Sequence, residues 1–252
     1  MHELTEAMAD YAGRDKIHLG VEVKSLAKSD DGTWTVTLSD GTTETGDGVI
    51  SCVESWAAAP LIRPIDAAIA DDLAAIPWGS SATISYAWDE AELDVDTNAF
   101  GVLCPAKERS ALLAVTYSSS KWPGRAPKGK VLLRAFVGGP QNQEIMKKST
   151  EELQAIVDRE VYKLLGIKPE VKPLWTKFFR WQDSMPQYTM GHLDRVARIE
   201  QRSTAVRGLA LAGGSFKGVG LPNCIETGEA GVTKVLADNG IVYDEVEEKR
   251  GY

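Results

Sequence analysis

A glycine-rich turn between a short apolar segment and a helical pattern constrains this chain more than any other feature. Residues 207–230 read GLALAGGSFKGVGLPNCIETGEAG. Residues 209–213 predict a buried strand, and a helix is expected to begin at Pro222 or Asn223. The intervening glycines permit positive φ and let a ligand approach the backbone closely. Because a helix N-terminus also exposes N–H groups, the segment is typical of an anion-binding turn. An ordinary flexible connection between a strand and a helix is the alternative.

The composition is that of a soluble globular protein. The chain has 252 residues, 43% of them hydrophobic and 25% charged, which allows one large domain or two small ones. A formal net charge of −8 argues against a nucleic-acid partner. No apolar run reaches the roughly 20 residues of a membrane span, and the acidic start MHELTEAMAD is unlike a signal peptide. Three scattered cysteines and three scattered histidines indicate neither a disulfide framework nor a metal site, so a reducing cytoplasm is expected.

The first 53 residues predict a helix, a β-meander and one buried strand. Leu4, Met8 and Tyr11 share one helical face, and Gly13 is expected to end that helix. Strands are expected over residues 18–26, 33–39 and 42–45, with a hairpin turn at Asp40-Gly41. The run GVISCV at 48–53 is typical of a strand buried on both faces.

The middle of the chain predicts a mixed α+β region. Alanine-rich residues 55–76, broken at Pro60 and Pro64, predict short helices. Ser149 and Glu152 have the spacing of a capping box. The helix that follows is expected to end at Gly166 and to bury Leu153, Ile156, Val157, Val161 and Leu164. Strands are expected over 81–88, 99–103, 111–117, 131–138 and 171–181, and a further helix over 190–204.

Two short motifs resemble known ligand-binding loops but lack residues that those loops require. Residues 124–130 have the spacing of a phosphate loop, but Val131 stands where a magnesium-binding Ser or Thr is required, and a strand pattern follows. Residues 94–98 open like a calcium loop but lack its glycine and its bidentate glutamate. The sequence spacing predicts neither a Ser/His/Asp triad nor a Cys/His pair, so no catalytic residue is assigned.

Six segments carry a resemblance to a known family. They are MHELTEAMADYA at 1–12, the hairpin at Asp40-Gly41, GVISCV at 48–53, FGVLCPAKERSALLAVTYSSSKWPGRAPKGKVLLRAFVGG at 100–139, RWQDSMPQYTMGHLDRV at 180–196, and LAGGSFKGVGLPNCIETG at 211–228. In this order they resemble the C-terminal half of the protoporphyrinogen oxidase family. This family of haem synthesis includes coproporphyrinogen III oxidases and belongs to the flavin amine oxidase superfamily. The resemblance covers essentially the whole chain.

The resemblance implies an FAD-dependent oxidase that oxidises a porphyrinogen with molecular oxygen. The implied fold class is α/β plus α+β. A partial Rossmann-like FAD-binding domain at 1–57 and 191–252 would flank an inserted mixed α+β substrate domain at 58–190. Residues 219–221 match the family's contact with the flavin ring and ribityl chain, and Val23 matches the valine beside the adenine. The implied cofactor-binding residues are therefore Val23, Gly213, Gly214, Val219, Gly220 and Leu221.

One departure from the family is large. The family begins with a strand, G-x-G-x-x-G and a helix, and this sequence contains no such fingerprint. The chain is therefore expected to be the second half of such an oxidase, to bind FAD poorly by itself and to lack turnover. Another flavoenzyme of the superfamily and a non-catalytic tetrapyrrole-binding module are the alternatives. A homodimer, and peripheral membrane contact of a full-length enzyme, are left open.

Overall fold

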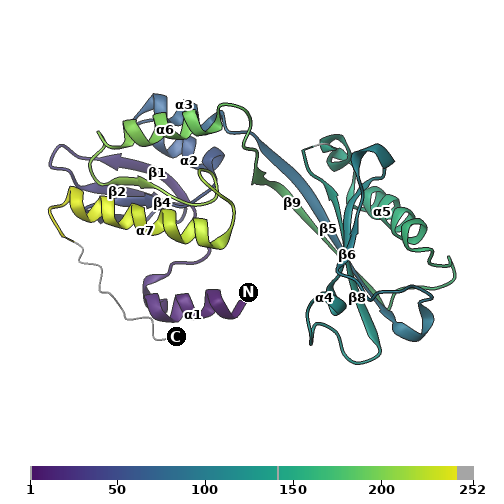
Figure 1. The fold of residues 1–252 in the computed structure, drawn as a ribbon. Coiled ribbons are helices and arrows are strands. Elements are labelled where there is room, and N and C mark those ends of the chain that lie inside the picture. The colour runs from purple at the N-terminus through teal and green to yellow at the C-terminus, as the bar shows by residue number, and fades with distance from the viewer. Residues whose placement is uncertain (1, 141, 243–252) are drawn as a thin grey trace. The chain divides into compact units, whose positions relative to one another are not determined.

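The computed structural model describes residues 2–140 and 142–242 (Figure 1). The chain divides into unit 1, Met1–Ile76 with Met190–Tyr252, and unit 2, Pro77–Thr189. The first boundary, expected at residue 58, instead falls after Ile76. The reason is packing, because Ile62 and Ile69 of the helices that follow residue 54 are fully buried in the core of unit 1.

Unit 1 contains a three-stranded antiparallel meander in the order β1-β2-β3. Its strands are β1 (Val23–Lys28), β2 (Trp34–Leu38) and β3 (Thr43–Gly46). The predicted hairpin at Asp40-Gly41 is confirmed, with Gly41 at a φ of 87°. The first strand does not begin at His18 as expected, because Gly20 takes a φ of 76° and interrupts the extended backbone.

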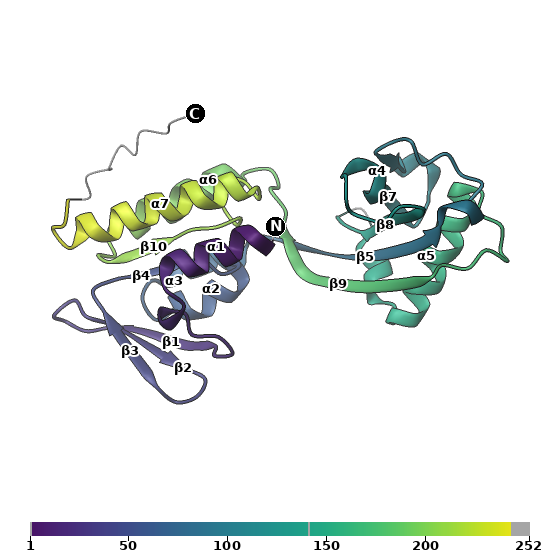
Figure 2. The same cartoon turned by 90° about the horizontal axis from the view of Figure 1, so that it is seen from below.

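A second sheet in unit 1 pairs β4 (Val49–Ser51) with β10 (Leu209–Leu211) in parallel, with Ile50 opposite Ala210. Helix α7 (Leu221–Asp238) runs alongside both strands in the two views (Figures 1 and 2). Gly231 allows this close packing, since a Cβ there would lie 3.2 Å from Ile50 Cγ2 and 3.3 Å from Ala210 Cβ. The β4 residues are only partly buried, unlike the expected strand with two buried faces.

The other helices of unit 1 are α1 (His2–Ala12), α2 (Ser55–Ile62), α3 (Ala67–Ala74) and α6 (His192–Ser203). Gly13 ends α1 as predicted, and its N–H donates to Ala9 O at 3.1 Å. The expected break at Pro60 is wrong, because α2 continues through Pro60 to Ile62 while its neighbour Ala59 is buried in the core. The start Met1 lies outside the described residues.

Unit 2 is built on a five-stranded antiparallel sheet in the order β6-β7-β8-β5-β9. All five expected strands are present, as β5 (Trp78–Asp89), β6 (Gly101–Leu103), β7 (Leu112–Tyr117), β8 (Lys130–Gly138) and β9 (Trp175–Pro186). The last strand starts later than expected, after the Pro169–Pro173 segment, because prolines cannot donate to a ladder. Unit 2 also contains the short helix α4 (Ser118–Lys121) and the 3-10 turns Glu90–Glu92, Ala106–Glu108 and Gln143–Lys147. A further 3-10 turn, Arg14–Lys16, follows α1 in unit 1.

Helix α5 (Thr150–Leu165) covers one face of this sheet (Figure 1). The predicted capping box is confirmed: Ser149 Oγ accepts from Glu152 N at 3.1 Å, and Ser149 N donates to Glu152 Oε2 at 3.0 Å. Leu153 is buried as expected, in a stripe that continues through Val157 and Val161. Leu164 is 39% exposed, so its predicted burial is wrong, because the i, i+4 stripe continues to Leu165.

Candidate functional site

The glycine-rich turn leaves the sheet at the carboxyl ends of β4 and β10. Because these strands are parallel, both end at the same edge. Ala212 N donates to Ser51 O at 2.9 Å, which extends the pairing by one residue. Gly213 then turns with a φ of 103°, and a Cβ there would lie 3.3 Å from Cys52 O. A glycine is therefore required where the turn passes the end of β4.

The middle of the turn is anchored in the core of unit 1. Ser215 is 2% exposed, and its Oγ accepts a hydrogen bond from Ser55 N at 3.1 Å. Phe216 packs in the same core, and its carbonyl oxygen lies 2.7 Å from Nε2 of the buried His192. That carbonyl can only accept, so Nε2 donates. These contacts hold the turn to α2 and α6 and leave its later residues on the surface.

The glycines of the turn differ in how much room they leave for a side chain. A Cβ on Gly214 would make only an ordinary contact, 3.6 Å from Val219 Cα. On Gly218, whose φ is 157°, it would lie 2.5 Å from Asn223 Cγ. On Gly220 it would lie 3.0 Å from Asn223 Oδ1. The turn is thus a compact cradle of backbone, as expected of a loop that contacts a ligand through peptide groups.

The N-terminus of α7 lies at the end of this cradle. Gly220 is the N-cap and supplies no side chain to the first N–H groups, and the first turn contains no acidic residue. The apolar side chains of Val219 and Leu221 are 54% and 45% exposed. The helix dipole favours an anion here by about 0.3–1 kcal/mol at an exposed site. Pro222 contributes no N–H, so the backbone donors at the start of the helix are those of Leu221 and Asn223. Beside the exposed apolar groups they suit a ligand with an anionic part and a flat apolar part. The helix begins at Leu221, one residue before Pro222, where it was predicted to start at the earliest.

Five of the six predicted cofactor-binding residues are brought together in this turn: Gly213, Gly214, Val219, Gly220 and Leu221. The structure gives Gly213 a framework role, because its N–H donates to Thr227 Oγ1 at 2.9 Å. Val23 lies elsewhere, at the start of β1 in the three-stranded sheet, and packs partly against the core of unit 1. The sequence linked Val23 to the turn only through a resemblance.

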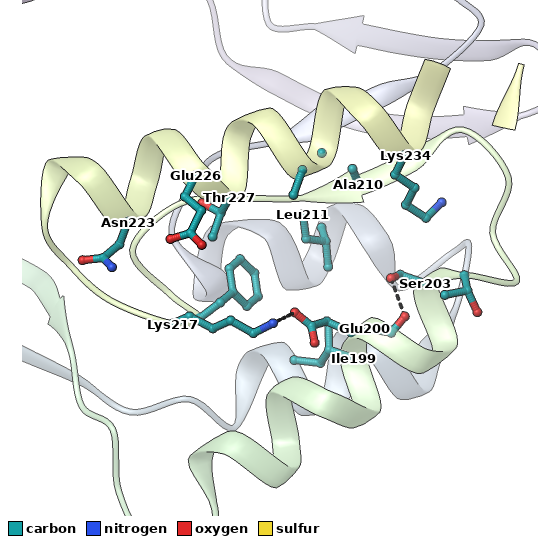
Figure 3. A pocket seen from close by; sticks show the side chains of 14 residues that line it. Ile199, Glu200, Ser203, Ala210, Leu211, Lys217, Asn223, Glu226, Thr227 and Lys234 are labelled. Atoms are coloured by element: carbon teal, nitrogen blue, oxygen red, sulfur yellow. Dashed lines mark hydrogen bonds and ion pairs between the residues drawn. The ribbon is translucent and has the colours of Figure 1, made fainter. Parts of the chain in front are cut away.

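A cavity of about 360 Å³ lies beside the turn, between α6, α7 and β10 (Figure 3). At its wall, Lys217 Nζ of the turn forms an ion pair with Glu200 Oε1 of α6 at 2.6 Å. Within α6, Ser203 Oγ donates to the Glu200 carbonyl at 2.8 Å. None of the six predicted residues lines this cavity. Sequence reasoning missed it because α6 and α7 are separate segments, and no spacing in the chain relates Glu200 to Lys217.

Other chemistry near the turn is limited. Burial raises the pKa of the Cys52 thiol, and Cys224 nearby raises it further, so this thiol stays protonated at neutral pH. Over residues 2–140 and 142–242, no group of three or more His, Cys, Asp or Glu side chains could hold a metal ion. No helix in the same residues is long and apolar enough to cross a membrane.

Unit 2 presents aromatic side chains on the sheet face opposite α5. Along β9, Phe178 packs against the core, so its neighbours in the alternation point to the other face. Trp175, Phe179 and Trp181 are exposed by 48%, 41% and 48%. The rings of Phe179 and Trp181 stack with centroids 6.2 Å apart, and Trp181 Nε1 donates to Thr83 Oγ1 at 3.2 Å. This aromatic strip is held flat by the sheet beneath it.

The parallel strand pair, the glycine-rich turn and the helix that follows it have the arrangement found in dinucleotide-binding folds. Comparison with known protein families shows which family the chain belongs to. Residues 1–236 match the model of the flavin-containing amine oxidoreductases. The chain therefore belongs to this family.

Individual relatives have narrower names. The chain is 35% identical over 228 residues to a chloroplastic protoporphyrinogen oxidase of Nicotiana tabacum. This alignment covers 84% of the chain and 40% of the relative. It is 31% identical over 237 residues to a coproporphyrinogen III oxidase of Bacillus subtilis, covering 94% of this chain and 49% of the relative.

A solved structure agrees with these relatives. A protein from Exiguobacterium sp. 255-15, provisionally named a protoporphyrinogen oxidase, superposes with a TM-score of 0.80 at 26% identity. The match covers 95% of this chain and 51% of that one. The chain thus spans about half the length of the proteins it matches, and the predicted family and fold class are confirmed.

Proposed function

We propose that the turn at residues 213–221 contacts FAD, and that the chain forms part of an oxidase that converts a porphyrinogen to the porphyrin with oxygen as acceptor. The observation that carries the proposal is the cradle itself. Side chains are excluded at Gly218 by Asn223, and α7 begins with uncapped N–H groups. In the proposal, unit 1 is the FAD-binding part and unit 2 the substrate-binding part. The names of the relatives support this assignment.

The roles of the chain's own residues follow from the cradle. FAD, when bound, would supply the electron acceptor that the oxidation requires. The peptide groups at Val219, Gly220 and Leu221 would hold it, and the exposed side chains of Val219 and Leu221 would keep water from its ring. Val23 is proposed to face the adenine. No side chain of the chain is assigned as an acid or base.

The aromatic strip of β9 offers apolar surface to a tetrapyrrole macrocycle. Trp175, Phe179 and Trp181 offer exposed rings on one face of the sheet, and Lys177 Nζ lies 5.3 Å from the centre of the Phe179 ring. Tetrapyrroles combine a broad apolar face with carboxylates, so rings and a cation are the complementary chemistry. We propose protoporphyrinogen IX or coproporphyrinogen III as the substrate class.

Titration with FAD tests the cradle, and it uses the chain joined to the preceding half of a relative, because the 252-residue chain by itself is expected to hold FAD weakly. In Gly220→Asp the new side chain meets Asn223 Oδ1 at 3.0 Å and adds a negative charge where the pyrophosphate or ribityl chain is expected. FAD binding should weaken about fivefold or more, since charges about 4 Å apart interact by at least about 1 kcal/mol. Gly228→Asp is the matched control, because no atom lies within 4 Å of a Cβ at Gly228. Equal FAD affinity in the two variants would contradict the proposed contact.

Activity is tested by porphyrin fluorescence. The sequence contains no G-x-G-x-x-G, so the 252-residue chain by itself should hold FAD weakly and not turn over porphyrinogen. Adding the preceding half of a relative, on the same chain or as a separate polypeptide, should restore yellow colour and activity. Stoichiometric FAD and an enzymatic rate in the 252-residue chain alone would show that other residues carry the cofactor.

Two other functions predict different results. Another flavoenzyme of the superfamily would oxidise an amine or a carotenoid after reconstitution and leave porphyrinogen unchanged. A tetrapyrrole-binding module without flavin would shift the Soret band of added porphyrin with no yellow cofactor present. Cytoplasmic localisation, a homodimer and peripheral membrane contact of the full-length enzyme complete the proposal. Cell fractionation and light scattering test these three points.

A further inference from the structure

A second cavity lies within unit 2, far along the chain from the glycine-rich turn. Its volume is about 570 Å³, within the range of small-molecule sites. The lining comes from β5, from the last two turns of α5 and from the segment 167–173 that follows α5. All of these residues belong to Pro77–Thr189, so the cavity is complete within one unit.

The floor of the cavity is aromatic and firmly held. Tyr86 is 1% exposed and stacks on Trp88 with ring centroids 5.2 Å apart and an interplanar angle of 14°. Tyr162 meets Trp88 edge-on, with centroids 6.4 Å apart. Its hydroxyl donates to Val171 O at 2.7 Å, which ties the 167–173 segment to α5. Because Tyr86 is almost fully buried, it supports the floor from beneath, and the partly exposed Tyr162 supplies the aromatic surface that a planar ring can contact.

The one carboxylate in the lining already accepts hydrogen bonds. Asp158 Oδ1 accepts from the Tyr86 hydroxyl at 2.7 Å and from Gln154 Nε2 at 2.6 Å. Burial, followed by the bond to Asp158, raises the pKa of Tyr86 well above its ordinary range, so the phenol stays a neutral donor. The negative charge of Asp158 is thus directed into unit 2 and toward its two donors.

Three cationic side chains line the same cavity and keep hydrogen-bond donors available: Arg159, Lys163 and Lys172. Arg159 and Lys163 are one helical turn apart on α5, and neither forms an ion pair with any residue of 2–140 or 142–242. Lys172 Nζ donates to Pro169 O at 2.6 Å, which uses one of its three donors. The charge that remains unmatched in the lining is therefore positive.

We propose that this cavity binds a planar aromatic carboxylate, with its ring against Tyr162 and its carboxylate between Arg159 and Lys163. Guanidinium and ammonium groups bind carboxylates through charge-assisted hydrogen bonds. The aromatic floor accounts for the ring, because aromatic pairs add favourable geometry to the area they bury. The proposal is independent of FAD and of porphyrinogen oxidation.

Calorimetric titration of the 252-residue chain with 2-naphthoate tests the site, with 2-naphthamide as the neutral probe of the same shape. We expect saturable binding of 2-naphthoate and clearly weaker binding of the amide. Arg159→Gln and Lys163→Gln should each weaken 2-naphthoate binding about two- to fivefold, the range for exposed charge pairs, and together about tenfold. Circular dichroism spectra of the variants should match that of the parent protein.

Lys147→Gln is the matched control, because Lys147 lies in the same unit, pairs with Glu144 and does not line the cavity. Its affinity for 2-naphthoate should equal that of the parent. The proposal is overturned if the amide binds as tightly as 2-naphthoate, or if the two charge-removing variants behave like the control. Absence of saturable binding up to the solubility limit of the probe also overturns it.

Discussion

Asp66 connects the start of α3 to α6, and its removal should destabilise unit 1 measurably. Asp66 Oδ1 accepts from Ala68 N and Ile69 N, both at 2.9 Å, so it caps α3. Arg202 Nη2 donates to Oδ2 at 3.1 Å and Nε to Oδ1 at 3.2 Å. Loss of an N-cap costs about 0.5–2 kcal/mol, and an exposed ion pair contributes about 0.2–1 kcal/mol. Asp66→Ala should therefore lower the free energy of unfolding by about 1–3 kcal/mol.

Two further variants separate the cap from the charge. Asp66→Asn keeps a good capping side chain and loses the ion pair, so it should cost less than about 1 kcal/mol. Arg202→Gln removes the same ion pair from the other side and should cost a similar amount. The double variant Asp66→Asn/Arg202→Gln should cost no more than the larger single change, because both changes remove one interaction.

The stabilisation by Asp66 should decrease as the pH is lowered. The pKa of Asp66 is lowered, first by the Ile69 N–H bond and also by Arg202. The stabilisation is therefore fully present above the unfolded pKa of about 4, and it is lost as the pH falls through the lower folded pKa. Urea unfolding followed by circular dichroism, at neutral pH and at acid pH, measures both results. An equal loss in Asp66→Asn and Asp66→Ala, or a difference from the parent that does not shrink in acid, would refute this account.

Three other changes test the packing of the helices, all by urea unfolding. Ser149→Ala should destabilise unit 2 by about 1 kcal/mol through loss of the capping box, and no change would contradict its role. Leu153→Ala should cost about 2–5 kcal/mol because Leu153 is fully buried, whereas Leu164→Ala on the same helix should cost less than about 1 kcal/mol. Gly228→Ala should stabilise α7 by up to about 1 kcal/mol, while Gly231→Ala should fall short of that gain because its methyl group meets Ile50 and Ala210. Similar losses for the two leucines, or equal gains for the two glycines, would show that the burial described here does not set stability.

Much of the local structure could be predicted from the sequence, because the signals are confined to a few neighbouring residues. The hairpin at Asp40-Gly41, the capping box of Ser149 and the helix ends at Gly13 and Gly166 are determined by the φ angles and hydrogen bonds that these residue types favour. The strand, glycine-rich turn and helix at residues 209–238 are also set by neighbouring residues. The candidate cofactor contact could therefore be predicted from the sequence.

Positions that depend on a partner elsewhere in the chain were harder to predict. The alanine-rich helices α2 and α3 have little in their sequence to show which core they join, and the burial of Ile62 and Ile69 in unit 1 moves the boundary to Ile76. Leu164 fits the apolar pattern of α5 as well as Leu165 does, and only the sheet beneath the helix distinguishes them.

The sequence by itself determined the family and the backbone of the turn, because both depend on residues that follow one another in the chain. Only the tertiary structure decided which groups meet around the two cavities. Glu200 and Lys217 come together through the packing of unit 1, as do Tyr86 and Lys163 through the packing of unit 2. Such contacts join segments separated along the chain, and burial of apolar faces, rather than local backbone preference, sets where those segments lie.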